Sequence, residues 1–389
     1  MDDWRHAGFG IYIHWPFCQS KCPYCDFNSY VSDSIDEKAW LTAYLAEIDR
    51  YARAVPNRIV NSVYFGGGTP SLMSPDTVNR IIENISSRWS FANNVEITLE
   101  ANPSSVEYVK FRDFSDAGVN RISLGIQSLN DEHLRLLGRT HTAKDALEAL
   151  NVAQSVFDQV SFDLIYARQT QTADEWQAEL SRALGFGTSH LSLYQLTIEP
   201  NTVFGARHSR GLLRNMPLDD VAEDMFFRTL NQCRDAGFCA YEVSNFATPG
   251  NQSKHNMIYW QCGDFLGIGP GAHGRLTIDG ARYSTESHAS PNVWLAETRS
   301  LSGESRRDVL SVESIMDEYL LMSLRTSGGL DTERLYSIDG YRIAEDIVTD
   351  LKNMNLLENL ENMLVATDSG RMVLNAVITE LSSNLVKPR

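Results

Sequence analysis

The amino-acid sequence predicts an α/β fold: a partial (βα)6 TIM-like barrel followed by a mostly helical, winged-helix-like C-terminal domain. Three observations predict this fold. Six β-branched segments alternate with helical segments in the first half of the chain, polar or glycine residues lie at the C-terminal ends of all six, and helical periodicity returns from about Arg306. Strands that alternate with helices form a parallel sheet.

The six predicted strands are short. They are Gly10–His14, Ser62–Phe65, Val95–Leu99, Arg121–Gly125, Val160–Ile165 and His190–Tyr194. The segments between them have the 3.6-residue apolar period of helices. These helices are Asp36–Ala54, Pro75–Trp89, Val106–Ala117, Ala143–Phe157 and Ala173–Gly185.

Polar residues at the strand ends favour a barrel over an open sheet. Cys18, the run Gly66–Pro70, Glu100, Gln127, Asp163 and Gln195 each follow a strand or lie late in one. In a barrel all six strand ends meet at one mouth, where barrels keep their active sites. An open sheet would gather them mainly at one switch point.

The pattern changes after Pro200, so we predict three regions: a core over residues 1–200, a barrel extension over 201–304 and a C-terminal domain over 305–389. The middle region should contain a helix at Leu218–Ala236, a strand at Tyr241–Val243, a polar, aromatic stretch at Asn251–Trp260 and a glycine-rich loop at Gly267–Gly274. The C-terminal helices should be Ser314–Leu324, Tyr341–Met354 and Met372–Leu385, with a hairpin between the last two.

Charge argues against binding to nucleic acid. The chain of 389 residues has a net charge of −16, and residues 305–389 hold nine Lys or Arg against fourteen Asp or Glu. A winged-helix-like domain of net charge −5 is therefore expected to pack against the rest of the chain or to bind a partner protein rather than to read DNA.

No targeting segment and no apolar run of membrane-spanning length is apparent, so we expect a cytoplasmic protein. A homodimer and a transient association with membranes stay open.

Cys18, Cys22 and Cys25 place three thiols within eight residues, directly after the first strand. Three thiolates can hold three irons of a 4Fe-4S cluster and leave the fourth iron open. The alternative is structural zinc, with His14 as the fourth ligand. Zinc motifs usually have two separated pairs of ligands, and the remaining Cys233, Cys239 and Cys262 are scattered, so the spacing favours a cluster.

The run Gly66-Gly67-Gly68-Thr69-Pro70 leaves the second strand at the same mouth. Glycines let a backbone approach a ligand closely, although a plain turn explains them equally well. A phosphate-binding P-loop is disfavoured because no Gly-Lys-Ser/Thr follows.

These motifs resemble the radical S-adenosylmethionine (SAM) superfamily: Cys-x3-Cys-x2-Cys, Tyr24 before the third cysteine, and the Gly-Gly-Gly-Thr-Pro loop. The resemblance covers most of the chain. It is strongest to the branch that contains oxygen-independent coproporphyrinogen III oxidase and the HemW haem chaperones, through the segments 12–18, 125–129, 137–141 and 162–166. It implies a 4Fe-4S cluster whose open iron is chelated by SAM, and a SAM that can be cleaved to a 5′-deoxyadenosyl radical.

The resemblance also implies roles for individual residues. Gly67, Gly68 and Thr69 would bind the methionine end of SAM, while Glu100, Gln127, Arg139 and Asp163 would hold its charged groups and ribose. Tyr12 and Tyr24 belong to the same motifs. Alternative roles for these residues are a helix cap for Glu100, a strand-end hydrogen bond for Gln127 and a surface charge for Arg139.

Two features separate the branches. The oxidases carry a fourth cysteine two positions after the third, where this chain has Phe27, and they have an N-terminal extension that contributes to the site.

The segment His255-Asn-Met-Ile-Tyr-Trp260 resembles the His-Asn-x-x-Tyr-Trp motif of HemW proteins, which is associated with haem. His255 is therefore a candidate axial ligand of haem iron, with His273 and Cys262 as alternatives and a hydrogen-bonded loop histidine as the competing interpretation.

One segment departs from the family pattern. Members usually continue Asp-Leu-Ile-Tyr with Gly-Leu-Pro, whereas this chain has Ala167-Arg168-Gln169 after Tyr166. Loss of Gly and Pro changes the permitted backbone beside Asp163, which puts the contact of Asp163 with SAM in question.

The sequence thus predicts a haem chaperone that binds a 4Fe-4S cluster, SAM and haem and delivers haem to apo-haemoproteins, respiratory ones among them. The alternatives are a radical SAM oxidase or dehydrogenase of coproporphyrinogen III or a related tetrapyrrole, and a zinc-stabilised interaction protein. Whether the protein is an enzyme stays open.

Overall fold

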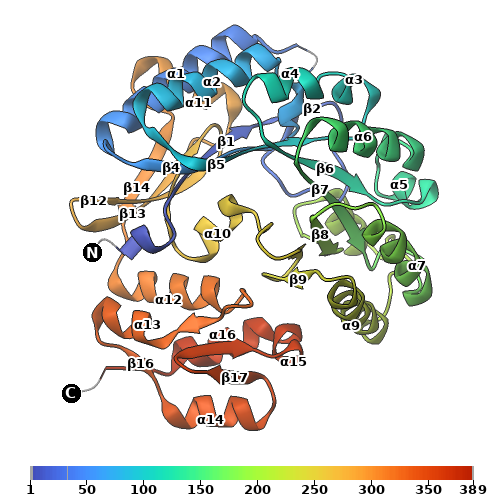
Figure 1. The fold of residues 1–389 in the computed structure, drawn as a ribbon, viewed down its shortest axis with the longest axis vertical. Helices are drawn as coiled ribbons and strands as arrows, with labels where there is room; N and C mark the ends of the chain where they lie inside the picture. The colour runs from blue at the N-terminus through green and yellow to red at the C-terminus, as the bar shows by residue number, and fades with distance from the viewer. Residues whose placement is uncertain (1–2, 33, 388–389) are drawn as a thin grey trace.

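The computed structural model describes residues 3–32 and 34–387. Its centre is a curved twelve-stranded sheet in the order β14-β13-β12-β11-β1-β4-β5-β6-β7-β8-β10-β9 (Figure 1). All six predicted strands are present, and they run parallel in chain order. They are β1 (Phe9–Trp15), β4 (Ile59–Gly67), β5 (Ser90–Ala101), β6 (Arg121–Gln127), β7 (Gln159–Tyr166) and β8 (His190–Gln195). The predicted α/β fold with a partial barrel is confirmed.

Helices cover the convex side of the sheet (Figure 1). They are α1 (Glu37–Ala54), α2 (Pro75–Arg88), α3 (Ser105–Tyr108), α4 (Phe111–Asp116), α5 (Asp131–Leu136), α6 (Ala143–Val156), α7 (Ala173–Leu184), α9 (Asp219–Asp235) and α11 (Pro291–Ser300). The short helix α8 (Val203–His208) instead packs against the cysteine loop, where the N–H of Phe204 donates to the carbonyl of Pro23 at 2.8 Å. Capping boxes at Thr142 and Thr172 fix the starts of α6 and α7. The single helix predicted at Val106–Ala117 is two helices, because the N–H of Lys110 bonds to the carbonyl of Glu107 at 3.0 Å and tightens the turn.

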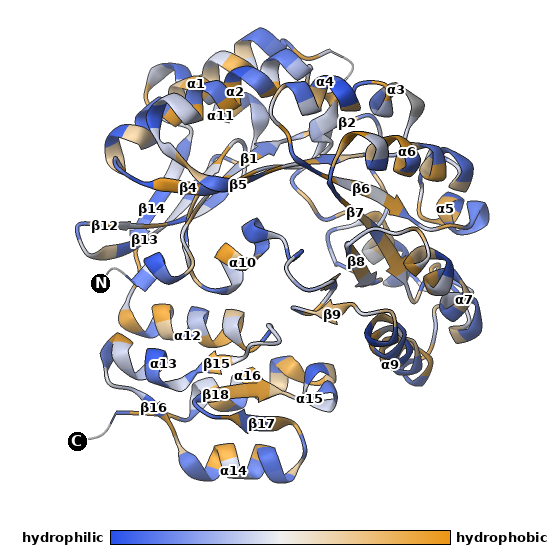
Figure 2. Cartoon of the chain, viewed as in Figure 1, coloured by the Kyte–Doolittle hydropathy of each residue, from blue (hydrophilic) through white to orange (hydrophobic). Residues whose placement is uncertain are grey.

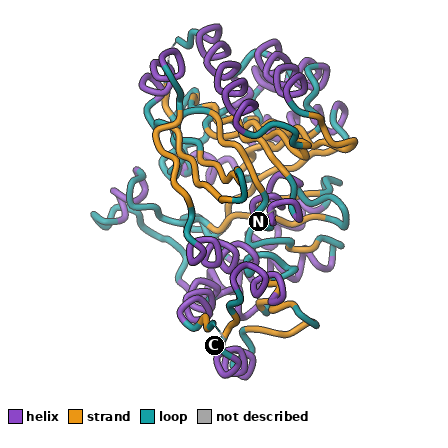
Figure 3. The backbone as a smooth tube through the Cα atoms, turned by 90° about the vertical axis from the view of Figure 1, so that its left-hand side faces the viewer, coloured by secondary structure: helices purple, strands orange, loops and turns teal. Residues whose placement is uncertain are grey.

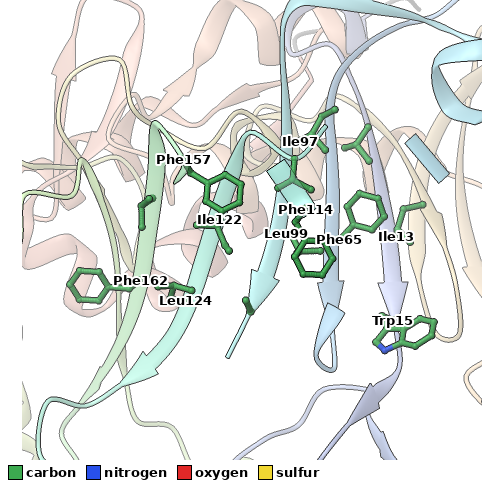
Figure 4. Packing of buried hydrophobic residues seen from close by; sticks show 14 of the residues in the cluster. Ile13, Trp15, Phe65, Ile97, Leu99, Phe114, Ile122, Leu124, Phe157 and Phe162 are labelled. Carbon is green, nitrogen blue, oxygen red and sulfur yellow. The ribbon is translucent and has the colours of Figure 1, made fainter. Parts of the chain in front are cut away.

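The main hydrophobic core lies between the sheet and these helices. Figure 4 shows alternate strand residues, such as Ile13, Phe65, Leu99, Leu124 and Phe162, on the same side of the sheet. Figure 2 shows the matching pattern on the helices, where orange and blue residues alternate along α1, α2 and α6. Period-two alternation in the strands against period-3.6 alternation in the helices produces this layered packing.

The other face of the same strands is polar. Neighbours across it include Glu100 and Ser123, which are paired in register, and Asp163 and Ser192, which are also paired. The helix α10 (Lys254–Trp260) lies on this concave side, below the sheet in Figure 1. The inner face is therefore free to line a site rather than to pack a barrel core.

The segment 201–304 extends the same sheet at both edges. Its strands are β9 (Cys239–Ala240), β10 (Asn245–Ala247), β11 (Asp264–Ile268), β12 (His273–Ile278), β13 (Ala281–Ser287) and, at the boundary, β14 (Glu304–Val309). The strand predicted at Tyr241–Val243 is wrong: the Glu242 side chain accepts bonds from the N–H groups of Ser244 and Asn245, which makes a turn there. The loop predicted at Gly267–Gly274 is shorter, because its two ends belong to β11 and β12.

The C-terminal segment has a second hydrophobic core, formed by residues between Met316 and Leu381 together with Cys262. Figure 3 shows it as a separate layer beneath the sheet. Its elements are α12 (Val312–Ser323), β15 (Leu330–Asp331), α13 (Thr332–Asp339), β16 (Arg342–Ile343), α14 (Glu345–Asn353), β17 (Leu357–Leu360), β18 (Met363–Ala366), α15 (Asp368–Met372), α16 (Leu374–Ser383) and β19 (Leu385–Val386).

The predicted hairpin is present as β17 and β18. The helix predicted from Tyr341 begins only at Glu345, because Arg342 and Ile343 pair with β19. The exact domain boundaries stay predictions. Among the described residues, no helix combines the length and the apolar character needed to cross a membrane.

Candidate functional site

A cavity of about 390 Å³ opens at the carboxyl ends of the parallel strands. Nearly all the residues predicted to bind a cluster or SAM line it. They are Cys18, Cys22, Tyr24, Cys25, Gly67, Gly68, Thr69, Glu100, Gln127, Arg139 and Asp163. Residues that are far apart in the sequence therefore meet at the mouth that the strand order predicts.

Cys18 ends the strand β2 (Phe17–Cys18), which pairs with β3 (Tyr30–Val31), and Cys22 and Cys25 lie on the loop between these two strands. Gly138 lies against Pro23 of this loop with φ +71°, and a Cβ atom at Gly138 would stand 2.5 Å from the ring of Pro23. Arg139 donates to the sulfur of Cys22 at 3.5 Å. The Leu-Gly-Arg-Thr-His segment thus holds the cysteine loop.

Burial raises the pKa of the Cys18 and Cys25 thiols. Neither thiol forms a disulfide. Soft sulfur donors on a short loop suit iron, and each of three cysteines can serve a different iron of a 4Fe-4S cube. The donor set therefore fits the cluster that the motif implies.

The zinc alternative requires four ligands around one ion, and the structure does not offer them. Both ring nitrogens of His14 are engaged: Nδ1 with the hydroxyl of Tyr12 at 3.1 Å and Nε2 with the carbonyl of Asn28 at 2.9 Å. No three His, Cys, Asp or Glu side chains among residues 3–32 and 34–387 are arranged to hold a single metal ion.

The glycine loop packs directly on the cysteine segment. The N–H groups of Gly68 and Thr69 donate to the carbonyls of Trp15 and Phe17 at 2.7 and 2.8 Å. A Cβ atom at Gly68 would lie 2.7 Å from the carbonyl oxygen of Phe17. Close packing against β2, which the sequence did not indicate, is thus one structural reason for this glycine.

Glu100 and Asp163 are two of the acidic side chains that line the cavity, beside Asp26, Glu107 and Glu199. The hydroxyl of Tyr64 donates to Glu100 at 2.8 Å, and the N–H of Gly67 donates to its other oxygen at 3.2 Å. Burial raises the pKa of Glu100 to about 7 and that of Asp163 to about 6. Burial disfavours the ionised form of both carboxyl groups. A bound cation such as an ammonium group would stabilise that form, so the pair is suited to a cationic ligand.

Arg139 connects several parts of the cavity. Besides Cys22, it donates to the side chain of Asn102 at 2.6 Å and to the carbonyl of Gly125 at 2.8 Å. Asn102 in turn donates to the hydroxyl of Thr69 at 3.1 Å. Gln127 has φ +69° at a bulge of β6.

Sequence reasoning did not assign Asn102 or Tyr64 to the site. The Glu-Ala-Asn-Pro run after the third strand was a usable signal for Asn102. Strand alternation, which turns Tyr64 toward the inner face with Tyr12, was a usable signal for Tyr64.

Tyr12 does not line the cavity. It stacks on Tyr64, with ring centres 6.1 Å apart, and bonds to His14 below the glycine loop. Tyr12 therefore lies beside the cavity and would not contact a ligand bound in it.

The segment after Asp163 has an unusual backbone. Ala167 has φ +56°, a conformation that glycine adopts more easily. Arg168 is buried in an ion pair with Glu179 and donates to the carbonyl of Gln127 at 3.3 Å. These contacts hold the loop in place and leave Asp163 in the cavity.

His255 lies outside this cavity, on α10, and is only 1% exposed. Its Nδ1 bonds to the hydroxyl of Ser62 at 2.7 Å and its Nε2 to the hydroxyl of Tyr259 at 2.6 Å. Burial lowers the pKa of its imidazole to about 3. Both ring nitrogens thus have hydrogen-bond partners, as the interpretation of a hydrogen-bonded histidine expects, and the role of His255 as an axial ligand of haem iron stays a prediction.

The fold and the cavity define a protein of the radical SAM type, and comparison with known proteins agrees. The family model "Radical SAM superfamily" matches residues 12–183. The chain resembles coproporphyrinogen III oxidase (HemN) from Escherichia coli in structure, with a TM-score of 0.80 and 21% identity over 97% of this chain and 90% of that one.

Sequence relatives narrow the assignment. The chain is 41% identical to "Heme chaperone HemW" of Haemophilus influenzae over 72% of this chain and 74% of the relative. It is 38% identical to the HemW of Escherichia coli, over 80% and 81% of the two chains. It is also 38% identical to "Radical S-adenosyl methionine domain-containing protein 1, mitochondrial" of Bos taurus, over 96% and 87%. The chain belongs to the HemW family of the radical SAM superfamily.

Proposed function

We propose that this protein is a haem chaperone: it binds haem and delivers it to apo-haemoproteins, with respiratory haemoproteins as the first acceptors to test. One observation carries the proposal, namely the 38–41% identity, over most of both chains, to relatives named haem chaperone. Phe27 supports it. This side chain is 59% exposed at the cavity, at the position where the oxidases have a fourth cysteine.

In this proposal Cys18, Cys22 and Cys25 hold a 4Fe-4S cluster, and SAM binds beside it. Gly67, Gly68 and Thr69 would hold the methionine end, Glu100 and Asp163 the ammonium and ribose, and Arg139 with Gln127 the remaining polar groups. Tyr24 lines the cavity beside the cysteines and would complete its wall. A bound cluster would supply electrons for one-electron chemistry on SAM, and the residues of the chain would position the ligand and exclude water.

Cluster binding is tested by colour and metal content. Cys22→Ala, reconstituted anaerobically with iron and sulfide, should lose most of the brown colour of the wild type, because one of three iron ligands is missing. Cys239→Ala is the matched control, since Cys239 is exposed and lies far along the chain. A colourless wild type with one zinc per chain would support the zinc-stabilised alternative instead.

Haem binding is tested by titration. Haem added to the cluster-loaded wild type should shift the Soret band with saturation near one haem per chain. A linear increase without saturation would contradict specific binding.

A second candidate is a radical SAM oxidase of coproporphyrinogen III. It is favoured by the complete cavity, in which the cysteine loop, glycine loop and acidic residues are all present. Anaerobic incubation with reductant, SAM and coproporphyrinogen III decides between the two: product formation supports the oxidase, and its complete absence from cluster-loaded protein removes it. The cytoplasmic location, the homodimer and the absence of nucleic-acid binding stay predictions.

A further inference from the structure

One segment of the surface has a charge opposite to that of the whole molecule. Residues 200–218 contain three arginines, one histidine and no acidic residue, so their net charge is +3 with a neutral histidine, in a chain of net charge −16. The basic side chains of this basic segment are all exposed, and they are Arg207, His208, Arg210 and Arg214. None of the three arginines has an ion-pair partner among residues 3–32 and 34–387.

We infer that the basic segment is the docking surface of a small acidic redox protein, which gives one electron to the cluster. The inference rests on the cluster of the proposed function and deepens it by naming the class of partner that reduces this cluster. The reduced flavin or iron–sulfur group of the partner is oxidised by one electron, and the 4Fe-4S cluster is reduced by one electron. No atom is transferred, and the oxidised partner then dissociates.

The basic segment touches the cysteine loop directly. The N–H of Phe204 donates to the carbonyl of Pro23 at 2.8 Å, and the ring centre of Phe204 lies 6.4 Å from that of Tyr24. Pro23 and Tyr24 lie between Cys22 and Cys25. Because electron transfer between proteins requires the two redox groups to come close, a partner that binds beside this loop is well placed to reduce a cluster held by its cysteines.

The backbone of the basic segment is held at both ends. Leu213 is buried in the same apolar cluster as Phe204. The side chain of Gln169 donates to the carbonyl of Arg214 at 2.8 Å, and the N–H of Thr170 donates to the next carbonyl at 2.7 Å. The arginines therefore project from an ordered support, which reduces the conformational entropy lost when a partner binds.

The basic segment also exposes apolar side chains. Val203 is 52% exposed and Leu212 is 59% exposed. Apolar contacts together with unpaired charges are typical of protein interfaces, and the interfaces of electron-transfer partners are small and short-lived. The positive charge would steer an acidic partner to this side of an otherwise acidic molecule and repel a basic one.

An anionic membrane is the competing partner for a basic, partly apolar surface. Helices that lie in a membrane interface are long and amphipathic. The helix α8 has six residues, and its largest apolar side chain, Phe204, is buried against the cysteine loop. The direct contact with the cysteine loop therefore favours a redox protein, and the membrane becomes an outcome of the test.

The test is a calorimetric titration of the full-length, cluster-loaded chain with plant-type ferredoxin, an acidic carrier whose potential is about −400 mV. Arg207→Glu combined with Arg210→Glu should raise the Kd at least ten-fold at low ionic strength. Added salt should weaken binding of the wild type more than binding of this double variant, because salt screens the charges. Freeze-quench electron paramagnetic resonance should show slower reduction of its cluster by reduced ferredoxin.

Two further variants control for charge and for apolar contact. Arg80→Glu combined with Arg299→Glu makes the same charge change at exposed positions of α2 and α11, and it should bind ferredoxin like the wild type. Leu212→Ser should raise the Kd and leave its salt dependence unchanged. All variants should match the wild type in iron content, urea midpoint and haem titration.

The docking proposal is overturned if the wild type does not bind ferredoxin, or if the Arg207 and Arg210 double variant binds it with an unchanged Kd. It is also overturned if ferredoxin does not bind while phosphatidylglycerol vesicles bind the wild type and not the double variant, which would make the segment a membrane surface. In these cases the iron content and haem titration of the wild type still decide the proposed function. A wild type that forms no cluster overturns both.

Discussion

Glu100 and Asp163 are buried carboxyl groups, and their burial lowers the stability of the folded protein when they are ionised. Neither forms an ion pair with a described residue, and burial raises the pKa of both. A group whose pKa is raised in the folded state lowers stability once the pH exceeds that pKa. Such groups are retained where a ligand uses them, which supports a binding role for this pair.

Glu100→Gln tests this cost. The wild-type carboxyl ionises with a pKa of about 7 in the fold, against an ordinary value of 4.5. Between these values the folded state holds more protons than the unfolded state, so the stability of the wild type falls as the pH rises through 7. In urea denaturation of the cluster-free protein, the advantage of the variant over the wild type should be larger at pH 8 than at pH 5, by about 2 kcal/mol.

The same variant should lose SAM affinity by at least ten-fold in the cluster-loaded protein, because the ammonium loses a carboxylate partner. Glu132→Gln, an exposed glutamate of α5, is the control for both measurements. A variant that is less stable at pH 8 and binds SAM normally would contradict a ligand role for Glu100.

Ala167 gives a second prediction at the residue scale. Its φ of +56° is strained for a residue with a Cβ atom and easy for glycine. Ala167→Gly should therefore raise the free energy of unfolding by about 0.5–1 kcal/mol, offset partly by greater freedom of the unfolded chain. Ala222→Gly, within the helix α9, should do the reverse. Loss of stability at Ala167→Gly would show that the backbone there is not strained.

At the residue scale, the sequence predicted the cavity lining well because each residue follows a strand, and parallel strands bring their ends together. It could not predict that Arg139 bonds to Cys22, or that Gly68 packs on Phe17. These contacts depend on how the loops fold back, which no local pattern encodes.

At the element scale, α10 is the informative helix. The sequence indicated a polar, aromatic stretch and a loop histidine, but the segment is helical. Ser253 caps the helix through the N–H of Asn256 at 3.3 Å, and Glu96 accepts from its first N–H groups. Only the three-dimensional structure brings Glu96 of β5 to this helix, so a seven-residue helix with weak local signals could not be predicted.

His255→Ala should destabilise the protein by about 2–4 kcal/mol, because it leaves a buried space and two hydroxyls, of Ser62 and Tyr259, without their shared partner. Urea denaturation measures this loss. His208→Ala, at an exposed position, is the control and should change stability by less than about 0.5 kcal/mol.

An axial-ligand role for His255 makes the opposite prediction. A variant His255→Ala that keeps full stability and loses only haem binding would contradict the expected loss of stability and support that role.

At the scale of the whole molecule, a curved sheet carries two separate cavities. One lies at the carboxyl ends of the strands, and the other lies between α10 and the C-terminal domain. The alternation of strands and helices predicted the parallel sheet and the cavity at its strand ends. The C-terminal domain depends on short strands that pair across long sequence distances, such as β16 with β19. Its arrangement therefore could not be predicted from local patterns.

The central claim is that the molecule carries haem and hands it on. The most direct measurement is the rate of haem transfer from the haem-loaded, cluster-loaded protein to a purified apo-haemoprotein of the respiratory chain, followed by the change in the Soret band. The spontaneous loss of haem to a large excess of apomyoglobin gives the reference rate.

A chaperone should transfer haem faster than this reference rate, and the rate should saturate with acceptor concentration, because a complex forms before transfer. A transfer rate equal to spontaneous loss and independent of the acceptor would contradict the account.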